Sequence, residues 1–396
     1  MMSQEVYIVD AVRTPVGKAP RGAFKHTRPD DLLVHSLKAL HQRNASLALS
    51  AIEDVIIGCA MPEAEQGMNV ARSAALLAGY PDTVPGMTIN RFCSSGVQTV
   101  AMAADRIRSG DADVIVAGGV ESMSMVPMGG HKFTVNPGVF NDEHMGIAYG
   151  MGLTAELVAQ KWQITPEQQL KFAVNSHQKA IAAQEAGFFN DEIAPFQLCK
   201  RTPDLQTGQI HKKIIEITQD EGPRADTSID KMAKLRSPFA LKSSVTAATS
   251  SQMSDGAAAV LVVSEKALKT YGLTPLAKFR SYSVAGVPPE IMGIGPVKAI
   301  PLALQKAGLT LDQIDWIELN EAFAAQSLAV MKDLELDHQK VNPQGGAIAL
   351  GHPLGATGAI RVATLVHGMK RNQKKYGMVT MCIGTGMGAC GIFEAL

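Results

Sequence analysis

Short apolar runs typical of buried strands alternate with amphipathic helical patterns in the first part of the chain. In ADVIVAG, at 112–118, almost every residue is apolar, as expected for a strand covered on both faces. Residues 95–109 place Val97, Val100 and Ile107 on one helical face, and Gly110 stands where a helix would stop. This alternation favours an α/β fold with largely parallel sheets. It predicts strands at 5–12, 53–58, 86–90 and 112–118, and helices at 30–43 and 95–109.

The second half of the sequence echoes the first. DQIDWIELNEAF at 312–323 parallels SAIEDVIIGCAM at 50–61, and YGMVTMCIGTGMG at 376–388 parallels ADVIVAGGVESM at 112–123. The two pairs have a similar separation, about 260 residues, which is the mark of a duplicated unit. The sequence therefore predicts two related α/β halves.

Residues 122–250 interrupt this rhythm. Their first part is rich in Gly, Pro and Met, and the stretch 195–235 is polar and lacks periodicity. Helices are expected at 154–162 and 166–186, and the second begins with a capping box in which Thr165 is the N-cap and Gln168 is N3. We interpret this region as an insertion that carries loops outside the main sheet.

Composition excludes several classes of protein. Lys plus Arg and Asp plus Glu both number 37, so the balanced charge does not favour nucleic acid or an anionic membrane as partner. No run reaches the ~18 apolar residues of a membrane span. The start, MMSQEVYIVDAVRTP, resembles neither a secretory signal nor a transit peptide, so a cytoplasmic location is expected. The 46% of hydrophobic residues can fill the cores of two or three domains.

Cysteines are few and widely spaced in this chain. They number five and form no CxxC pair and no cluster with histidine, so neither a disulfide framework nor a zinc site is predicted. Such thiols are usually buried and inert, unless their surroundings activate them. The five are Cys59, Cys93, Cys199, Cys382 and Cys390.

The surroundings of Cys93 are unusual. It lies in NRFCSSG, between a predicted strand and a predicted helix, so its sulfur is expected at a helix N-terminus. Free backbone N–H groups and the positive end of the helix dipole favour a thiolate there. Small neighbours, Ser94, Ser95 and Gly96, leave room for a substrate. This motif alone fits a nucleophile and a buried structural cysteine equally well.

Two further segments are rich in glycine. His352 and Pro353 lie within GGAIALGHPLGATG (345–358), where glycine is too frequent for a stable helix or strand, so the backbone bends tightly or approaches something closely. This framing favours a catalytic base over a structural histidine. Cys382 ends a buried strand and is followed by GTG, whose backbone N–H groups could bind an oxyanion. The segment lacks the GxGxxG order of a dinucleotide site.

Together, these three segments resemble the signature regions of the thiolases. The resemblance also includes Asn320-Glu-Ala-Phe323, Ser-Asp-Gly-Ala-Ala at 254–258, VDAVRTPVGK at 9–18 and MGLTAE at 151–156. It extends from about residue 5 to the end of the chain. Several separate motifs in register form a much more specific match than any one of them.

The resemblance implies a role for each signature residue in exchanging acyl groups between CoA thioesters. Cys93 would attack the C3 carbonyl of a 3-oxoacyl-CoA and hold the acyl group as a thioester. His352 would take the proton of the Cys93 thiol and later that of incoming CoA, and Cys382 would protonate the departing enolate. One oxyanion would face His352 and a water held by Asn320, and the other the backbone N–H groups of Cys93 and Gly384.

The fold implied is a layered αβαβα arrangement of two duplicated α/β halves with mixed five-stranded sheets, plus a loop domain. Residues 1–121 with 251–272 would form the first half, 273–396 the second, and 122–250 the loop domain that binds CoA. By the same resemblance, the residues expected to line the CoA and acyl site are Met151, Arg224, Phe239, Ser251, Met292 and Phe323. CoA would be a substrate, with no cofactor or metal required. The family further implies a homodimer or homotetramer, possibly joined by a multifunctional β-oxidation partner.

Two departures indicate a branch of the family. Ser94 and Gly150 replace a glycine and a histidine that enzymes dedicated to acetoacetyl-CoA often have. Both differences favour the broad-chain branch of fatty-acid β-oxidation. The alternatives are an acetyl-CoA acetyltransferase that makes acetoacetyl-CoA, a ketoacyl synthase, and an acyl-CoA-binding relative without catalysis. The third position, Cys382, argues against a synthase, and the presence of Cys93, His352 and Cys382 argues against an inactive relative.

Overall fold

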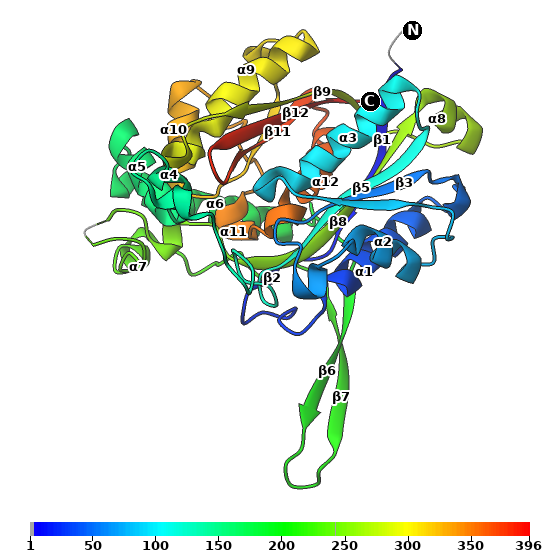
Figure 1. Ribbon diagram of the computed structural model, residues 1–396, viewed down its shortest axis with the longest axis horizontal. Coiled ribbons are helices and arrows are strands. Elements are labelled where there is room, and N and C mark those ends of the chain that lie inside the picture. Colours follow the sequence, from blue (N-terminus) through cyan, green and yellow to red (C-terminus); the bar gives the residue numbers. More distant parts are fainter. Residues whose placement is uncertain (1–3, 242) are drawn as a thin grey trace.

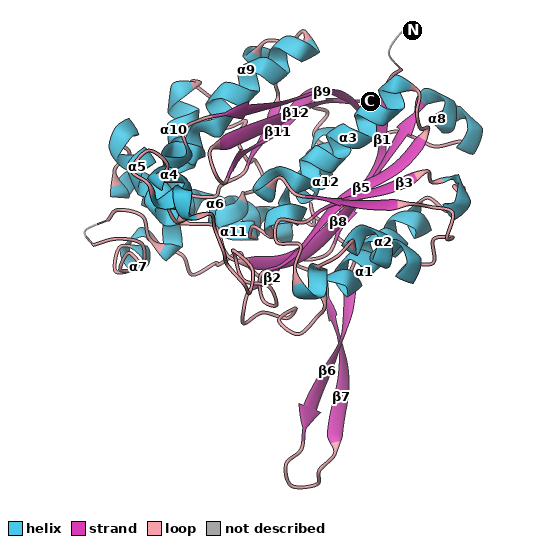
Figure 2. Ribbon diagram, in the orientation of Figure 1, coloured by secondary structure: helices cyan, strands magenta, loops and turns pink. Residues whose placement is uncertain are grey.

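The computed structural model describes residues 4–241 and 243–396. In this part of the chain, ten strands form one hydrogen-bonded sheet in the order β10–β11–β12–β9–β1–β8–β5–β3–β4, with β2 beside β8 (Figures 1 and 2). The strands of the main sheet are β1 (Val6–Arg13), β2 (Gly17–Lys18), β3 (Asp54–Gly58), β4 (Gly86–Ile89), β5 (Val114–Ser122), β8 (Ser254–Ser264), β9 (Ala277–Gly286), β10 (Trp316–Leu319), β11 (Tyr376–Ile383) and β12 (Met387–Ala395).

The sheet consists of two halves with the same internal arrangement, which confirms the predicted duplication. In the first half β3 is parallel to β5 and β5 is antiparallel to β8; in the second β10 is parallel to β11 and β11 is antiparallel to β12. The first half has five strands in a row. The second has four, and an isolated parallel bridge between Ile317 and Val341 takes the place of a fifth. The halves meet through two residue pairs of β1 and β9, at Tyr7 and Ile8.

Helices form the other layers. Apolar residues of α3 and α12, such as Val100 and Ile360, share one core with residues of both half-sheets, so these two helices form the central layer (Figure 2). The helices α1 and α2 cover the outer face of the first half, and α9 and α10 that of the second, in separate cores. The order of layers is therefore αβαβα, as predicted. The bounds are α1 (Pro29–Arg43), α2 (Val70–Leu77), α3 (Ser95–Ser109), α8 (Glu265–Tyr271), α9 (Gly295–Ala307), α10 (Ala324–Asp333), α11 (Ala347–Leu350) and α12 (Leu354–Arg371).

The interpretation of 345–358 as too glycine-rich for a helix was wrong, because α12 begins inside it. Glycine is needed where α12 meets α3: a Cβ added to Gly358 would lie 2.2 Å from the backbone nitrogen of Val97, and one on Gly96 would lie 2.4 Å from that of Ala359. The two backbones therefore approach more closely than any side chain permits. The sequence correctly suggested that the backbone of this segment approaches another part of the chain closely. The approach takes place where α12 crosses α3.

This crossing gives a stability prediction. In an exposed helix, Gly→Ala stabilises by up to about 1 kcal/mol. Gly358→Ala should instead destabilise by about 2 kcal/mol or more, because the new methyl group meets backbone that cannot move aside. Urea unfolding checks this, with Gly286→Ala as control, since a Cβ there comes no closer than 4.0 Å to its neighbours. Equal unfolding midpoints for the two variants would contradict the prediction.

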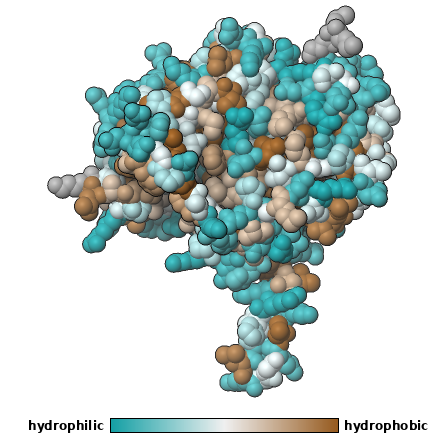
Figure 3. Space-filling model, viewed as in Figure 1, coloured by the Kyte–Doolittle hydropathy of each residue, from teal (hydrophilic) through white to brown (hydrophobic). Residues whose placement is uncertain are grey.

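The insertion forms its own small elements, α4 (Met145–Ala148), α5 (Met151–Trp162), α6 (Pro166–Glu185), β6 (Phe196–Pro203), β7 (Ile210–Ile217) and α7 (Ile229–Met232). The capping box of Thr165 and Gln168 is confirmed. The stretch 195–235 was expected to consist of loops, yet β6 and β7 form a hairpin that extends away from the body (Figures 1 and 3). Both faces of the hairpin are largely exposed, so no apolar alternation marks it in the sequence.

Only the base of the hairpin packs on the body, where the Phe196 ring meets Phe24 and His35 edge-on. Among the described residues, no helix combines the length and the apolar character that crossing a bilayer requires.

Candidate active site

Cys93 lies where predicted, between a strand and a helix. It follows β4 and sits in a short 3₁₀ turn, Phe92–Ser94, directly before α3. Burial raises the pKa of its thiol to about 11, although hydrogen bonds from the backbone N–H groups of Gly384 and Cys93 itself lower it. The expectation that the helix N-terminus favours a thiolate was therefore wrong in its net direction, because the loss of solvation is the larger effect. A protonated thiol at this position needs a base before it can attack.

His352 lies immediately before α12, with its ring held at both nitrogens. Nδ1 is 2.7 Å from Thr357 Oγ1, and Nε2 is 3.3 Å from Asn320 Nδ2. An Nε2 that accepts from an amide carries no proton, so Nδ1 carries the proton and donates to Thr357. Burial, and then the charge of Arg361, lower the imidazole pKa to about 3. The ring is therefore neutral near pH 7 and presents a lone pair at Nε2.

This shift predicts a loss of stability in acid. The pKa of His352 is about 3 in the folded chain and about 6.5 when unfolded, so between these values the unfolded chain binds the proton more tightly. The contribution is complete above pH 6.5 and falls as the pH is lowered, by about 2 to 3 kcal/mol at pH 4.5. Urea unfolding at pH 7.5 and 4.5 should show a smaller loss for His352→Gln than for the unchanged protein. Equal losses would contradict the prediction.

Cys382 lies near the end of β11 and is fully buried. Burial raises its pKa far above the usual range of a thiol, and the neighbouring Cys93 raises it further. The two thiols are thus close enough to affect each other's ionisation. Cys382 keeps its proton at neutral pH, which suits a group that is to donate one.

Most of the residues predicted to line the CoA and acyl site gather around Cys382. Met151, Met292 and Phe323 belong to the same apolar group as Cys382, and the Phe239 ring packs edge-on against Phe323 at 6.0 Å. In addition, the backbone N–H of Ser251 donates to Ala322 O at 2.9 Å. Because Ala322 belongs to this apolar group, Ser251 lies beside it.

Arg224 lies apart from that apolar group, on an exposed segment. Its backbone N–H donates to His177 Nδ1 at 3.2 Å. Burial lowers the pKa of Lys18, and the nearby charge of Arg224 lowers it further. The two cations are therefore close enough for their charges to repel, and an anionic group near both would relieve that repulsion.

Sequence reasoning missed Glu121, a buried carboxylate at the end of β5. It accepts hydrogen bonds from Ala60 N and Gly355 N, both at 2.8 Å, and from Met61 N at 3.2 Å. It therefore ties the segment after β3 to the first turn of α12, and residues of both segments belong to the apolar cluster against which Cys93 packs. The signal was present, because Glu121 is a charge at the end of an otherwise apolar strand.

The role of Glu321 was also missed, although the residue belongs to the Asn-Glu-Ala-Phe motif. Its buried carboxylate accepts from Ser176 Oγ at 2.6 Å, from Asn342 Nδ2 at 2.7 Å and from Ile348 N at 3.2 Å. The last contact fixes the segment that precedes His352. Glu321 thus fixes the backbone before His352, and Glu121 fixes the backbone after it.

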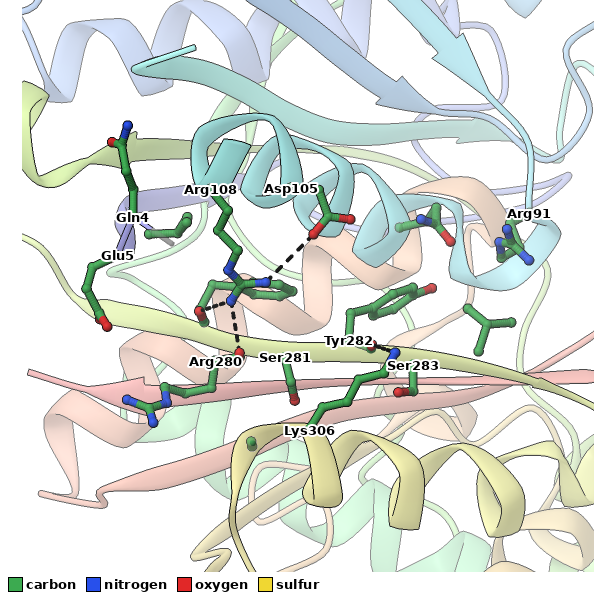
Figure 4. Close-up of a pocket in the computed structure, with 15 residues that line it drawn as sticks. Gln4, Glu5, Arg91, Asp105, Arg108, Arg280, Ser281, Tyr282, Ser283 and Lys306 are labelled. Carbon is green, nitrogen blue, oxygen red and sulfur yellow. Dashed lines mark hydrogen bonds and ion pairs between the residues drawn. The ribbon is translucent and has the colours of Figure 1, made fainter. Parts of the chain in front are cut away.

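A groove of about 650 Å³ lies between α3 and β9, outside this site (Figure 4). Arg91, Tyr282 and Lys306 are among its walls, and none of the predicted site residues lines it. The site described above is therefore distinct from this groove.

Comparison with known proteins places these features in one family. Residues 6–266 match the model for the N-terminal domain of thiolase, and residues 273–395 that for the C-terminal domain. A 3-ketoacyl-CoA thiolase of Bacillus subtilis is 50% identical over 395 residues, which cover 99% of each chain. Crystal structures of human mitochondrial 3-ketoacyl-CoA thiolase and of the Bacillus anthracis acetyl-CoA acetyltransferase superpose with TM-scores of 0.90 and 0.89, at 37% and 38% identity, over 100% of both chains.

Proposed function

The chain belongs to the thiolase family, and on that basis we propose that it cleaves 3-oxoacyl-CoA with CoA to give acyl-CoA and acetyl-CoA. It is an acyltransferase, and its relatives named 3-ketoacyl-CoA thiolase favour a place in fatty-acid β-oxidation. The observation that supports the proposal is the placement of three groups: the Cys93 thiol directly before α3, the neutral His352 imidazole just before α12, and the buried Cys382 thiol near the end of β11, where the proximity of Cys93 affects its pKa. CoA is a substrate, and we propose no other cofactor.

In the first half-reaction, His352 Nε2 takes the proton of the Cys93 thiol and the sulfur attacks C3 of the substrate. The C2–C3 bond then breaks, its electron pair passes to the acetyl-CoA enolate, and the Cys382 thiol protonates C2. The products are acetyl-CoA and an acyl thioester on Cys93, with a proton left on His352 and a thiolate at Cys382.

The second half-reaction restores these groups. The proton of His352 passes to the Cys382 thiolate, and the imidazole then accepts the proton of the incoming CoA thiol. The CoA sulfur attacks the thioester, and Cys93 leaves and regains a proton from His352. Every proton removed in one half-reaction is returned in the other, so the cycle needs no external acid or base.

Two negatively charged oxygens form along this path. The backbone N–H groups of Cys93 and Gly384, which approach the Cys93 sulfur, would stabilise the oxygen on the acyl carbon. His352 and a water held by Asn320 would stabilise the oxygen of the acetyl unit; Asn320 Oδ1 is buried and has no hydrogen-bond partner among the described residues, so it could hold that water. Losing one such donor typically costs roughly 2.7–4 kcal/mol of barrier.

For the domains, we propose 1–121 with 251–272 as the first half, 122–250 as the loop domain that binds CoA, and 273–396 as the second half. The sheet order supports the two halves, since β1, β3, β4, β5 and β8 adjoin one another, as do β9 to β12. The proximity of Met151 and Phe239, both from the insertion, to Cys382 supports the assignment of 122–250.

We further propose a cytoplasmic homodimer or homotetramer, with a multifunctional β-oxidation enzyme as an additional partner. Light scattering tests the assembly, and a mass near the 42.0 kDa of one chain would contradict it.

The decisive test of function is the CoA-dependent loss of absorbance of 3-oxoacyl-CoAs with four carbons and with eight to sixteen. Comparable or faster cleavage of the longer substrates would support β-oxidation. Cleavage of acetoacetyl-CoA alone would favour the second candidate, an acetyl-CoA acetyltransferase. The likeness to the Bacillus anthracis structure supports this alternative. No cleavage of any substrate would overturn the proposal.

A further inference from the structure

Two backbone N–H groups are proposed to stabilise the oxygen on the acyl carbon, and one of them belongs to Cys93 itself. This N–H is part of the peptide unit that joins Phe92 to Cys93. Because a peptide unit is planar and trans, the direction of its N–H is fixed once the direction of its carbonyl is fixed. The groups that hold the Phe92 carbonyl therefore also aim the Cys93 N–H.

The backbone at Phe92 has a conformation that needs support. Its φ angle is 44°, in the left-handed region that a bulky side chain rarely adopts. Such a conformation persists only where the surrounding structure holds it. On the N-terminal side of this residue, Asn90 Oδ1 accepts a hydrogen bond from the Phe92 N–H at 2.8 Å. On the other side, the carbonyl of Phe92 is held by Ser95.

Ser95, the first residue of α3, binds this carbonyl twice. Its Oγ donates to Phe92 O at 2.7 Å and its backbone N–H donates to the same oxygen, so both lone pairs of the carbonyl are used. The backbone N–H of Arg91 donates to Ser95 Oγ at 2.9 Å, which leaves the hydroxyl proton for Phe92 O. The support is rigid, because Ser95 is fully buried against β3: a Cβ added to Gly58 would lie 2.6 Å from the Ser95 Cβ.

We propose that Ser95 is a positioning residue, whose hydroxyl holds the Phe92–Cys93 peptide so that the Cys93 N–H faces the acyl oxygen in both half-reactions. This inference rests on the proposed function and adds a residue to it. A hydroxyl that donates to a carbonyl also polarises the amide, which makes the N–H at its other end a stronger donor. Ser95 thus acts on the reacting oxygen through one peptide unit, without touching the substrate.

The test is Ser95→Ala, which removes the hydroxyl and keeps the backbone bond to Phe92 O. Acylation of Cys93 by acetyl-CoA, followed by intact mass over time, and thiolysis of a 3-oxoacyl-CoA should both slow by about 10-fold, since the acyl oxygen becomes charged in each. Alkylation of Cys93 by iodoacetamide creates no charged oxygen, so its rate, followed by peptide mass, should change by less than about 3-fold. A merely structural role would displace the sulfur and slow alkylation as much as acylation.

Ser94→Ala is the matched control. Ser94 is equally buried and makes the same pair of bonds one residue earlier, from its Oγ at 3.3 Å and from its backbone N–H at 3.1 Å, but to Arg91 O. That carbonyl belongs to the peptide unit before Phe92, which does not contain the Cys93 N–H. Loss of the Ser94 hydroxyl should therefore leave the rates of acylation and thiolysis unchanged.

Three results would overturn the role of Ser95: an unchanged acylation rate in Ser95→Ala, an equal slowing in Ser94→Ala, or an equal slowing of acylation and alkylation in Ser95→Ala. In each case the acetyl adduct of the unchanged protein and its cleavage of a 3-oxoacyl-CoA would leave the proposed function standing. Absence of both in the unchanged protein would contradict the proposed function itself, and the role of Ser95 with it.

Discussion

Replacing Cys93 by alanine is expected to lower the rate of thiolysis by about 10⁴-fold or more. The loss is large because no other group can hold the acyl chain between the two half-reactions, and single knockouts of catalytic nucleophiles in other enzymes cost this much. The backbone N–H groups of Gly384 and Cys93 also reach the Cys93 sulfur, so in the proposed mechanism a thiol elsewhere would lack these donors. The measurement is the CoA-dependent absorbance decay of a 3-oxoacyl-CoA, together with the intact mass of the protein after mixing with acetyl-CoA.

Cys199→Ala is the matched control for that experiment. Cys199 is exposed on β6 of the hairpin, so its thiol is accessible to reagents but remote from the site. This variant should keep both the activity and the single acetyl adduct. An adduct that persists in Cys93→Ala, or that disappears in Cys199→Ala, would show that a different thiol carries the acyl group.

Replacing Cys382 by alanine is expected to separate the two halves of the chemistry. Breaking the C2–C3 bond requires a proton at carbon, and losing a positioned acid typically costs 10²–10⁴-fold. Acylation of Cys93 from acetyl-CoA requires no proton at carbon and should persist. Thiolysis should therefore fall by about 10²-fold or more, while the acetyl adduct on Cys93 still forms.

The control for Cys382 is Cys390→Ala, on the neighbouring strand β12. Cys390 is also fully buried, but its sulfur lies 3.9 Å from that of Met378, in the core under α9. Its removal leaves a small cavity and should change stability more than turnover. If Cys382→Ala lost acylation and thiolysis in equal measure, Cys382 would have a structural role instead of donating the proton.

Much of the fold was predictable because strands and helices that pack against a core have apolar residues at regular spacing in the sequence. The strands β1, β3 and β4 and the helices α1 and α3 lie within about two residues of their predicted bounds, since each packs against a core, whereas β5 ends about four residues later than predicted. Two features were not predictable. The hairpin β6–β7 has no buried face, so no period marks it, and α12 contains glycines that only its crossing with α3 explains.

For the site, the motifs around Cys93, His352 and Cys382 led to the residues proposed here, but their ionisation could not be derived from sequence. The helix N-terminus was visible in the sequence, whereas the burial that raises the thiol pKa depends on both half-sheets together. Glu121 could be recognised as a charge at the end of an apolar strand, but its role could not. Its hydrogen-bond partners come from two distant segments, and nothing near it in the chain indicates them.

The glycine crossing of α3 and α12 has one more consequence. The thiol precedes one of these helices and the imidazole precedes the other, so each half of the duplicated chain supplies one of the two groups that must meet. In the proposed mechanism the active site therefore forms where the two halves meet, so a substitution at the crossing can separate the thiol from the imidazole while each half stays folded. Such a variant should lose more turnover than its loss of stability explains, so activity has to be measured beside unfolding.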